Sequence, residues 1–315
     1  MLFLLLSVLL SVLLLLNFRL FPRYNVDTFQ AIVFNYPVCF LTGWLLLPAQ
    51  QTFSIDFSQT WTWMALALGV GFIVTFLLAG ASTQRMGITV TSLANNLSLV
   101  IPVCFSLFVF SDGNSMSFDA LNYVGLALAL VAVALSTYRP AIPESTPGGI
   151  VSTDPSPAPA VGQPKSIGAI LLPIAVFLCY GATNTTINYM NIHYIPSADK
   201  TVQVTLTMVI GAIAAGAVML FIRLVRGQVR LQARSLLGAV TLGVPNFLSF
   251  YTLLLALSAF RGNGAFVYPL YNIGVILVAA AVAGIFFHEK LNTANRIGLG
   301  LAVLAIGLLS WQQFV

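Results

Sequence analysis

Several apolar stretches of this sequence carry asparagine and tyrosine at positions that leucine would normally occupy. Asn95 and Asn96 are adjacent in the stretch SLANNLSLVIP. An unpaired carboxamide in hydrocarbon costs on the order of several kcal/mol, so each side chain must face a partner, a cavity or water. Because adjacent residues point about 100° apart on a helix, one can face a cavity while the other contacts a neighbouring helix. The pair can therefore bind a small polar molecule or join two helices.

Similar polar residues occur in three further apolar stretches. In CYGATNTTINY, Tyr180, Asn184 and Asn188 follow one another at intervals of four, which places them on one stripe of a helix that can line a pore. A tyrosine near a helix end can instead belong to the aromatic belt at a membrane surface, an alternative that applies above all to Tyr268. With Asn95 and Asn96, the predicted substrate-binding residues are Tyr180, Asn184, Asn188, Asn246, Tyr251, Tyr268, Tyr271 and Asn272.

The sequence offers little for catalysis or metal binding. It contains eight acidic residues and two histidines, and no charged residue lies in the central third of a predicted helix. We find no nucleophile paired with a base, no metal-ligand spacing, no phosphate-binding glycine loop and no nucleic-acid motif. Coupling to protons or ions usually leaves a carboxylate within the membrane. We therefore expect no enzyme, no cofactor and no metal, and a substrate that is neutral or internally charge-balanced.

The composition indicates which elements hold these residues. Of the 315 residues, 59% are hydrophobic and 7% are charged, whereas a soluble domain has roughly 25% charged residues. A helix needs about 20 apolar residues to cross the hydrocarbon core. We therefore expect an all-α integral membrane protein, with ten transmembrane helices at 2–20, 27–47, 61–82, 87–110, 119–138, 166–190, 200–222, 235–258, 264–287 and 293–313.

A polar segment divides these helices into two groups of five. Residues 138–165 are rich in Pro, Ser and Gly, which predicts a flexible linker between residues 1–137 and residues 166–315. The two groups resemble each other, for example in LGVGFIVTF at 68–76 and LGVPNFLSF at 242–250. Because five helices end on the membrane face opposite to their start, the second group is inverted relative to the first. Inverted repeats predict a substrate site near the membrane midplane.

The basic residues predict an orientation. Eleven of the thirteen Lys and Arg residues fall on one face, in the connections after the odd-numbered helices, and only Lys200 and Arg261 fall on the other. The positive-inside rule then places the linker 138–165 and the basic segment 223–234 in the cytoplasm and both termini outside. We expect a multi-pass protein of a bacterial inner membrane, acting as a monomer or homodimer.

The end of the sequence carries a pattern seen in a known family. Residues 262–310 comprise a small-residue start, an apolar helix that ends in His288 and Glu289, and a Gly-rich last helix. This segment resembles the ten-helix, EamA-like branch of the drug/metabolite transporter superfamily, with His288 where glycine is usual. Residues 83–103 resemble the same element in the first half, where Asp112 alone offers the acidic position. We interpret His288 and Glu289 as solvated residues at a helix end.

The resemblance implies transport of small organic solutes by alternating access, through a cavity lined by the first, third, fourth, sixth, eighth and ninth helices. Asn35 and Tyr36 lie on the second helix, outside that set, and we interpret them as packing residues. A cavity of Asn, Tyr and Phe suits a small polar or aromatic, amino-acid-like metabolite moved by uniport or exchange. The alternatives are a flippase for a lipid-linked molecule and a membrane receptor or enzyme. The family commonly has cytoplasmic termini, opposite to the charge-based orientation.

Overall fold

The structure is a computed structural model that describes residues 1–47, 53–102, 105, 120–137, 167–194, 201–259, 264–289 and 291–309. These residues form helices and connections, without a strand. The helices are α1 (Leu2–Leu20), the short 3-10 helix η1 (Phe21–Tyr24), α2 (Thr28–Leu45), α3 (Thr60–Met86), α4 (Ile88–Leu97), α6 (Ala120–Thr137), α7 (Ile167–Tyr194), α8 (Thr201–Val225), α9 (Ala233–Ala259), α10 (Gly264–Phe287) and α11 (Thr293–Leu309).

The fold class expected from the sequence is confirmed at the level of an all-α membrane protein. Among the described residues, five helical stretches are long and apolar enough to cross a membrane. They fall on α1 with η1, α3, α8, α9 and α10, and they span Leu2–Tyr24, Thr60–Met86, Val202–Val225, Ala233–Leu253 and Leu270–Phe287. The bounds of α1 and α10 are those that the sequence predicts, whereas the linker 138–165 lies outside the described residues.

The prediction of one continuous helix over 87–110 is wrong, because α4 ends at Leu97. The Ser98 hydroxyl donates to the Asn95 carbonyl oxygen at 2.5 Å, and a helical turn resumes at residues 100–102. Pro102 has no N–H to donate to the Ser98 carbonyl. That carbonyl accepts instead from the Ile101 N–H at 3.0 Å. The break therefore lies within three residues of Asn95, at the centre of the predicted site.

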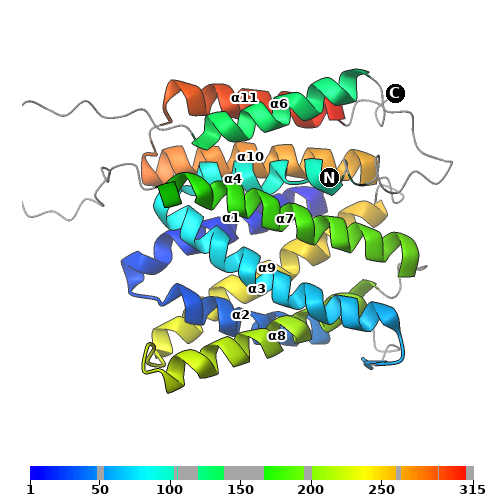
Figure 1. The fold of residues 1–315 in the computed structure, drawn as a ribbon, viewed down its shortest axis with the longest axis vertical. Helices are drawn as coiled ribbons and strands as arrows, with labels where there is room; N and C mark the ends of the chain where they lie inside the picture. Colours follow the sequence, from blue (N-terminus) through cyan, green and yellow to red (C-terminus); the bar gives the residue numbers. More distant parts are fainter. Residues whose placement is uncertain are drawn as a thin grey trace, which may run out of the picture.

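The helices run alongside one another, and their connections gather at two ends (Figure 1). One end holds the connections 21–27, 226–232 and 288–292 together with Gly87. We call it the Arg-rich end because the described arginines lie there, namely Arg19, Arg23, Arg85, Arg223, Arg226, Arg230, Arg234 and Arg296. The N-terminus lies toward the opposite end (Figure 1).

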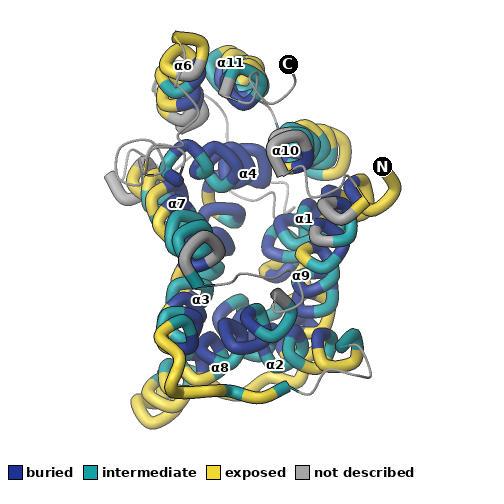
Figure 2. Tube along the Cα trace, turned by 90° about the vertical axis from the view of Figure 1, so that its right-hand side faces the viewer, coloured by how far each residue is buried: buried dark blue, intermediate teal, exposed yellow. Residues whose placement is uncertain are grey.

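Most contacts between the described helices join α1, α2, α3, α4 and α6 to α7, α8, α9, α10 and α11. In these contacts α1 packs against α9 and α10, α2 against α8 and α9, α3 against α7 and α8, α4 against α7 and α10, and α6 against α11. Figure 2, which looks along the helices, shows α1, α3, α4, α7 and α9 around a common centre. Helices α2 and α8 close this centre on one side, and α6 and α11 lie beyond α4 and α10 on the other. The two halves of the chain therefore interlock.

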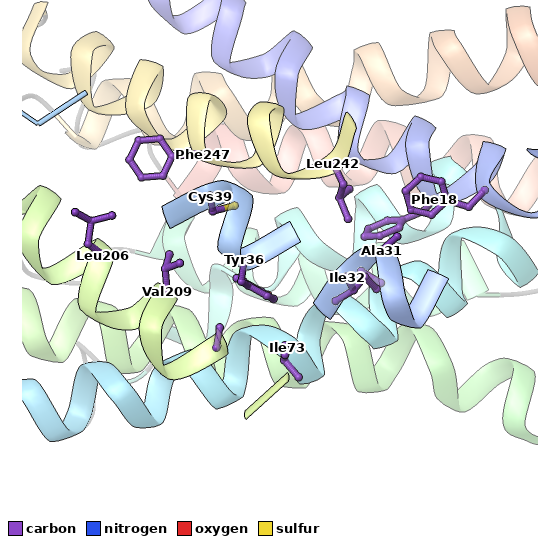
Figure 3. Packing of buried hydrophobic residues seen from close by; sticks show 13 residues of the cluster. Phe18, Ala31, Ile32, Tyr36, Cys39, Ile73, Leu206, Val209, Leu242 and Phe247 are labelled. Atoms are coloured by element: carbon purple, nitrogen blue, oxygen red, sulfur yellow. The ribbon is translucent and has the colours of Figure 1, made fainter. Parts of the chain in front are cut away.

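Close helix contacts allow this arrangement. The largest core cluster draws residues from α1, η1, α2, α3, α8 and α9, and Figure 3 shows α2 contributing Ile32, Tyr36 and Cys39 to it. A methyl group at Gly69 of α3 would overlap the backbone of α8, and one at Gly211 of α8 would overlap the backbone of α3. These glycines let the two backbones touch, as small residues do in membrane helix pairs.

Candidate functional site

Two tyrosines from different halves meet near the centre of the molecule. Tyr36 on α2 is 2% exposed, and its hydroxyl is buried without a hydrogen-bond partner. Tyr180 on α7 is close to Tyr36 and packs against the core cluster that contains it. Tyr180 is half-buried and packs against two separate core clusters. Its hydroxyl has no hydrogen bond to any described residue. A buried hydroxyl without a partner is uncommon in native proteins, because burial removes it from water and so costs free energy.

A third tyrosine extends this pair toward α1. Tyr271 on α10 is close to Tyr180, and its hydroxyl is 2.7 Å from the hydroxyl of Ser11 on α1. Tyr271 is half-buried and packs against core clusters that include residues of α1 and α10. The three tyrosines therefore form a series across the centre, carried by α2, α7 and α10.

The break after α4 lies against α7. Asn95 is half-buried, and its carboxamide has no hydrogen bond to a described residue. Asn184, one turn after Tyr180 on α7, donates to the Ser98 hydroxyl at 3.4 Å. A methyl group at Gly181 would overlap the side chain of Ile101, which shows how closely α7 approaches this part of the chain. We call Tyr36, Tyr180, Tyr271, Ser11, Asn95 and Asn184 the central polar site.

Two predicted site residues turn back onto their own helices. Asn96 is 5% exposed and donates to the Ser92 carbonyl oxygen at 2.8 Å. Asn272 is 4% exposed and donates to the Tyr268 carbonyl oxygen at 2.8 Å. Each of these equivalent bonds in α4 and α10 uses one N–H of the carboxamide for a contact within the same helix. The structure thus separates Asn95 from Asn96, which the sequence presents as a pair.

Asn246 forms a contact between helices. Its amide group donates to the Asn35 carboxamide oxygen at 3.2 Å and to the Cys39 sulfur at 3.4 Å, which joins α9 to α2. The amide nitrogen of Asn35 is buried without a partner. The interpretation of Asn35 as a packing residue agrees with these bonds, whereas Tyr36, interpreted in the same way, contributes an unpaired hydroxyl to the centre.

The remaining predicted residues lie apart from one another. Tyr251 is half-buried and lines a shallow apolar depression between α8 and α9, with Val202, Thr205, Phe247 and Phe250. Asn188 is half-buried and makes no hydrogen bond to a described residue. Tyr268 is 44% exposed, which matches the aromatic-belt alternative.

The Arg-rich end is closed by hydrogen bonds between the halves. Gln30 on α2 is fully buried, and its carboxamide donates to the Arg230 carbonyl at 2.9 Å and accepts from the Gln232 N–H at 3.1 Å. The Asp27 N–H donates to the Ser235 hydroxyl at 3.1 Å. Nearby, Gln84 donates to the Thr28 hydroxyl at 2.6 Å. This end is therefore tied together by paired polar groups.

Glu289 completes the closure, and its interpretation as a solvated residue is wrong. Its half-buried carboxylate accepts from the Ile88 N–H at 3.0 Å and from the Thr89 hydroxyl at 3.4 Å. The carboxylate thereby caps the N-terminus of α4, where unpaired N–H groups and the helix dipole favour a negative charge. His288 is exposed as expected, and its φ of 49° lies in the left-handed region that favours glycine. This geometry explains why a glycine would suit that position.

Sequence reasoning missed Tyr36 and Ser11. The only signal for Tyr36 is its place in FNYP, one residue before Pro37, within a helix that the family resemblance leaves outside the cavity. Ser11 is a single small polar residue in a leucine-rich helix, and its pairing with Tyr271 joins residues 260 positions apart. Among the described residues, no group of three His, Cys, Asp or Glu side chains could hold a metal ion.

Comparisons with known proteins find a related sequence and a related fold, but they do not indicate a function. No family model matches the chain. An uncharacterised protein of Haemophilus influenzae is 26% identical over 305 residues, which cover 95% of this chain and 93% of that protein. A protein of known crystal structure matches 98% of this chain and 97% of its own chain, with a TM-score of 0.55 and 15% sequence identity. At this identity the structural match shows a shared fold alone.

Proposed function

We propose that this protein is a secondary transporter of the drug/metabolite transporter type, with ten transmembrane helices in two inverted five-helix halves. It moves a small polar or aromatic metabolite across the membrane by alternating access. The observation that carries the proposal is the central polar site, where the side chains of Tyr36, Tyr180 and Asn95 make no hydrogen bond to a described residue inside an apolar helical assembly. Such groups are stabilised when a ligand or water pairs with them.

The helix contacts support two related halves. If the halves are related, each helix of the first half has a counterpart in the second. In chain order, α1, α2, α3, α4 and α6 then correspond to α7, α8, α9, α10 and α11. The α1–α9 contact then becomes α3–α7, α1–α10 becomes α4–α7, and α2–α9 becomes α3–α8. The contacts α2–α8, α4–α10 and α6–α11 become themselves. This is the pattern that a pseudo-two-fold relation between the halves produces, and transporters with such a relation bind their substrates where the halves meet.

The distribution of paired and unpaired polar groups supports a direction of access. Polar groups at the Arg-rich end are bonded across the halves, for example Gln30 to Arg230 and Glu289 to Ile88. In the proposed cycle this arrangement is the state closed at the Arg-rich end, and substrate reaches the centre from the opposite end. Rocking of one half against the other breaks the bonds at the Arg-rich end and exposes the centre there.

The chemistry of the site favours a neutral or charge-balanced solute. Of the described carboxylates, Asp27 caps α2, Asp56 precedes α3 and Glu289 caps α4, so each lies at a helix end. The central polar site instead offers hydroxyl and carboxamide groups together with aromatic rings. Hydroxyls and carboxamides can bond to the polar end of a metabolite, and the rings can pack against its apolar part.

Transport by the purified protein tests this proposal. A thermal-shift screen against a metabolite library identifies a ligand, since binding at a hundred times the dissociation constant stabilises a protein by about 2.7 kcal/mol. Reconstituted vesicles loaded with that ligand should then take up the labelled ligand by counterflow, without a proton or sodium gradient. Binding without counterflow would indicate a receptor, and strict dependence on a gradient would contradict uniport or exchange.

A matched pair of variants assigns the transport to the central polar site. Tyr180→Phe removes one hydroxyl from the centre, and Tyr268→Phe removes the same group from a side chain that is 44% exposed. We expect Tyr180→Phe to weaken ligand binding by roughly 5- to 150-fold, because a polar ligand group loses its buried partner. Tyr268→Phe should leave affinity unchanged. Equal affinities in both variants would place the ligand elsewhere.

A further inference from the structure

The connection between α8 and α9 presents unneutralised arginines at the protein surface. Arg226, Arg230 and Arg234 are exposed, and Arg223 is half-buried. In the part of the chain that the structure describes, the three exposed guanidinium groups have neither an acidic partner nor a hydrogen bond. We call residues 223–234 the basic loop.

The backbone of the basic loop is held in place by α2. The fully buried Gln30 carboxamide bonds to the Arg230 carbonyl at 2.9 Å and to the Gln232 N–H at 3.1 Å. On the other side of the loop, the Arg223 guanidinium lies 3.9 Å from the centre of the Phe29 ring, a cation–π contact. These contacts fix the loop from within, so its exposed arginines occupy a defined surface.

Exposed apolar side chains accompany the arginines. Phe221 is 67% exposed, Val225 is 71% exposed and Leu231 is 61% exposed. Apolar side chains beside cationic ones are typical of a surface at the boundary between acyl chains and headgroups, where the apolar groups enter the membrane. A guanidinium group matches a phosphate with two parallel hydrogen bonds.

We propose that the basic loop binds the phosphate headgroups of anionic phospholipids in the leaflet at the Arg-rich end. Phe221, Val225 and Leu231 contact the acyl chains next to these headgroups. The binding requires only that the protein lies in a membrane, so it is independent of the proposed transport. Each arginine of the basic loop that pairs with a headgroup phosphate is expected to raise lipid affinity roughly fivefold.

The test compares two double variants that remove the same charge from the same end. Arg226→Gln with Arg230→Gln alters the basic loop, and Arg23→Gln with Arg296→Gln alters two exposed arginines elsewhere at that end. Each protein is placed in nanodiscs of phosphatidylcholine, with or without phosphatidylglycerol. The melting temperature is measured in both lipids, and native mass spectrometry measures retained phosphatidylglycerol.

We expect phosphatidylglycerol to raise the melting temperature of the wild-type and control proteins. The basic-loop variant should lose most of this increase and retain phosphatidylglycerol roughly 10- to 30-fold more weakly. All proteins should melt alike in phosphatidylcholine, because the changed side chains are exposed. Equal losses in both variants would overturn the proposal, since they would reflect general charge attraction. An equal stabilisation by soluble glycerophosphoglycerol would also overturn it, since a free anion would then suffice.

Discussion

The Arg-rich end and the centre of the molecule differ in the hydrogen bonding of their polar side chains. At the Arg-rich end, the side chains of Gln30, Gln84 and Glu289 bond across helices, and the Thr83 hydroxyl is the one buried side-chain exception that we find there among the described residues. In the centre, Tyr36 and Tyr180 carry hydroxyls without a hydrogen bond to the described chain.

This difference separates two roles for polar residues inside an apolar protein. A paired group stabilises one arrangement of the helices, and its removal costs stability. An unpaired group costs stability in the substrate-free protein and is favourable only when something binds to it. Variants at the two regions should therefore change stability in opposite directions.

The largest expected effect is at Gln30. Gln30→Leu removes both bonds to the basic loop and leaves the Arg230 carbonyl and Gln232 N–H without their partner. We expect a loss of about 2–4 kcal/mol in the free energy of unfolding. Gln228→Leu, an exposed position in the same loop, is the control and should cost almost nothing. A stable Gln30→Leu protein would show that the closure contributes little.

Asn95 and Asn96 allow an unpaired and a paired carboxamide to be compared within one helix. Asn95→Leu should weaken ligand binding by roughly 5- to 150-fold, because its carboxamide is free to bond the ligand. Asn96→Leu should leave affinity unchanged, because its donor already bonds the Ser92 carbonyl. Titration of both variants with the ligand from the thermal-shift screen measures the difference. The reverse order of affinities would show that Asn96 is the residue that contacts the ligand.

Glu289 tests whether the closure depends on charge. Glu289→Ala leaves the Ile88 N–H unpaired at the start of α4 and should destabilise the protein by about 1–2 kcal/mol. Glu289→Gln keeps an acceptor oxygen and should recover part of this loss. Thermal unfolding of the two variants at equal ionic strength gives the values. Equal stability of the Glu289→Ala and wild-type proteins would show that Glu289 is a solvated residue after all.

A smaller effect on stability is expected at His288, which precedes Glu289. Its φ of 49° lies in the left-handed region, which costs roughly 1–2 kcal/mol for residues other than glycine. His288→Gly should therefore raise the melting temperature slightly, offset in part by the greater entropy of glycine in the unfolded chain. His288→Ala, which keeps the strained backbone, is the control. A fall in melting temperature for His288→Gly would indicate that the His288 side chain has a role of its own.

The sequence predicts the helices better than the site because the two depend on different information. Hydropathy is local, and it defines α1 and α10 to the residue. The direction in which Asn95 and Asn96 point depends on which helices surround α4, which no local pattern contains. Glu289 lies 201 positions from the N–H that it caps, so its role depends on the packing of α10 against α4.

The most direct test of the central claim removes the same atom from two tyrosines of the central polar site. The Tyr180 hydroxyl has no hydrogen bond to a described residue, whereas the Tyr271 hydroxyl is 2.7 Å from that of Ser11. The measurement is the melting temperature of the substrate-free Tyr180→Phe and Tyr271→Phe proteins. We expect Tyr180→Phe to melt at or above the wild-type temperature, and Tyr271→Phe to lose about 1 kcal/mol of stability with its hydrogen bond. Destabilisation by Tyr180→Phe as large as that by Tyr271→Phe would show that the Tyr180 hydroxyl is a paired structural group, and it would contradict a ligand site at the centre.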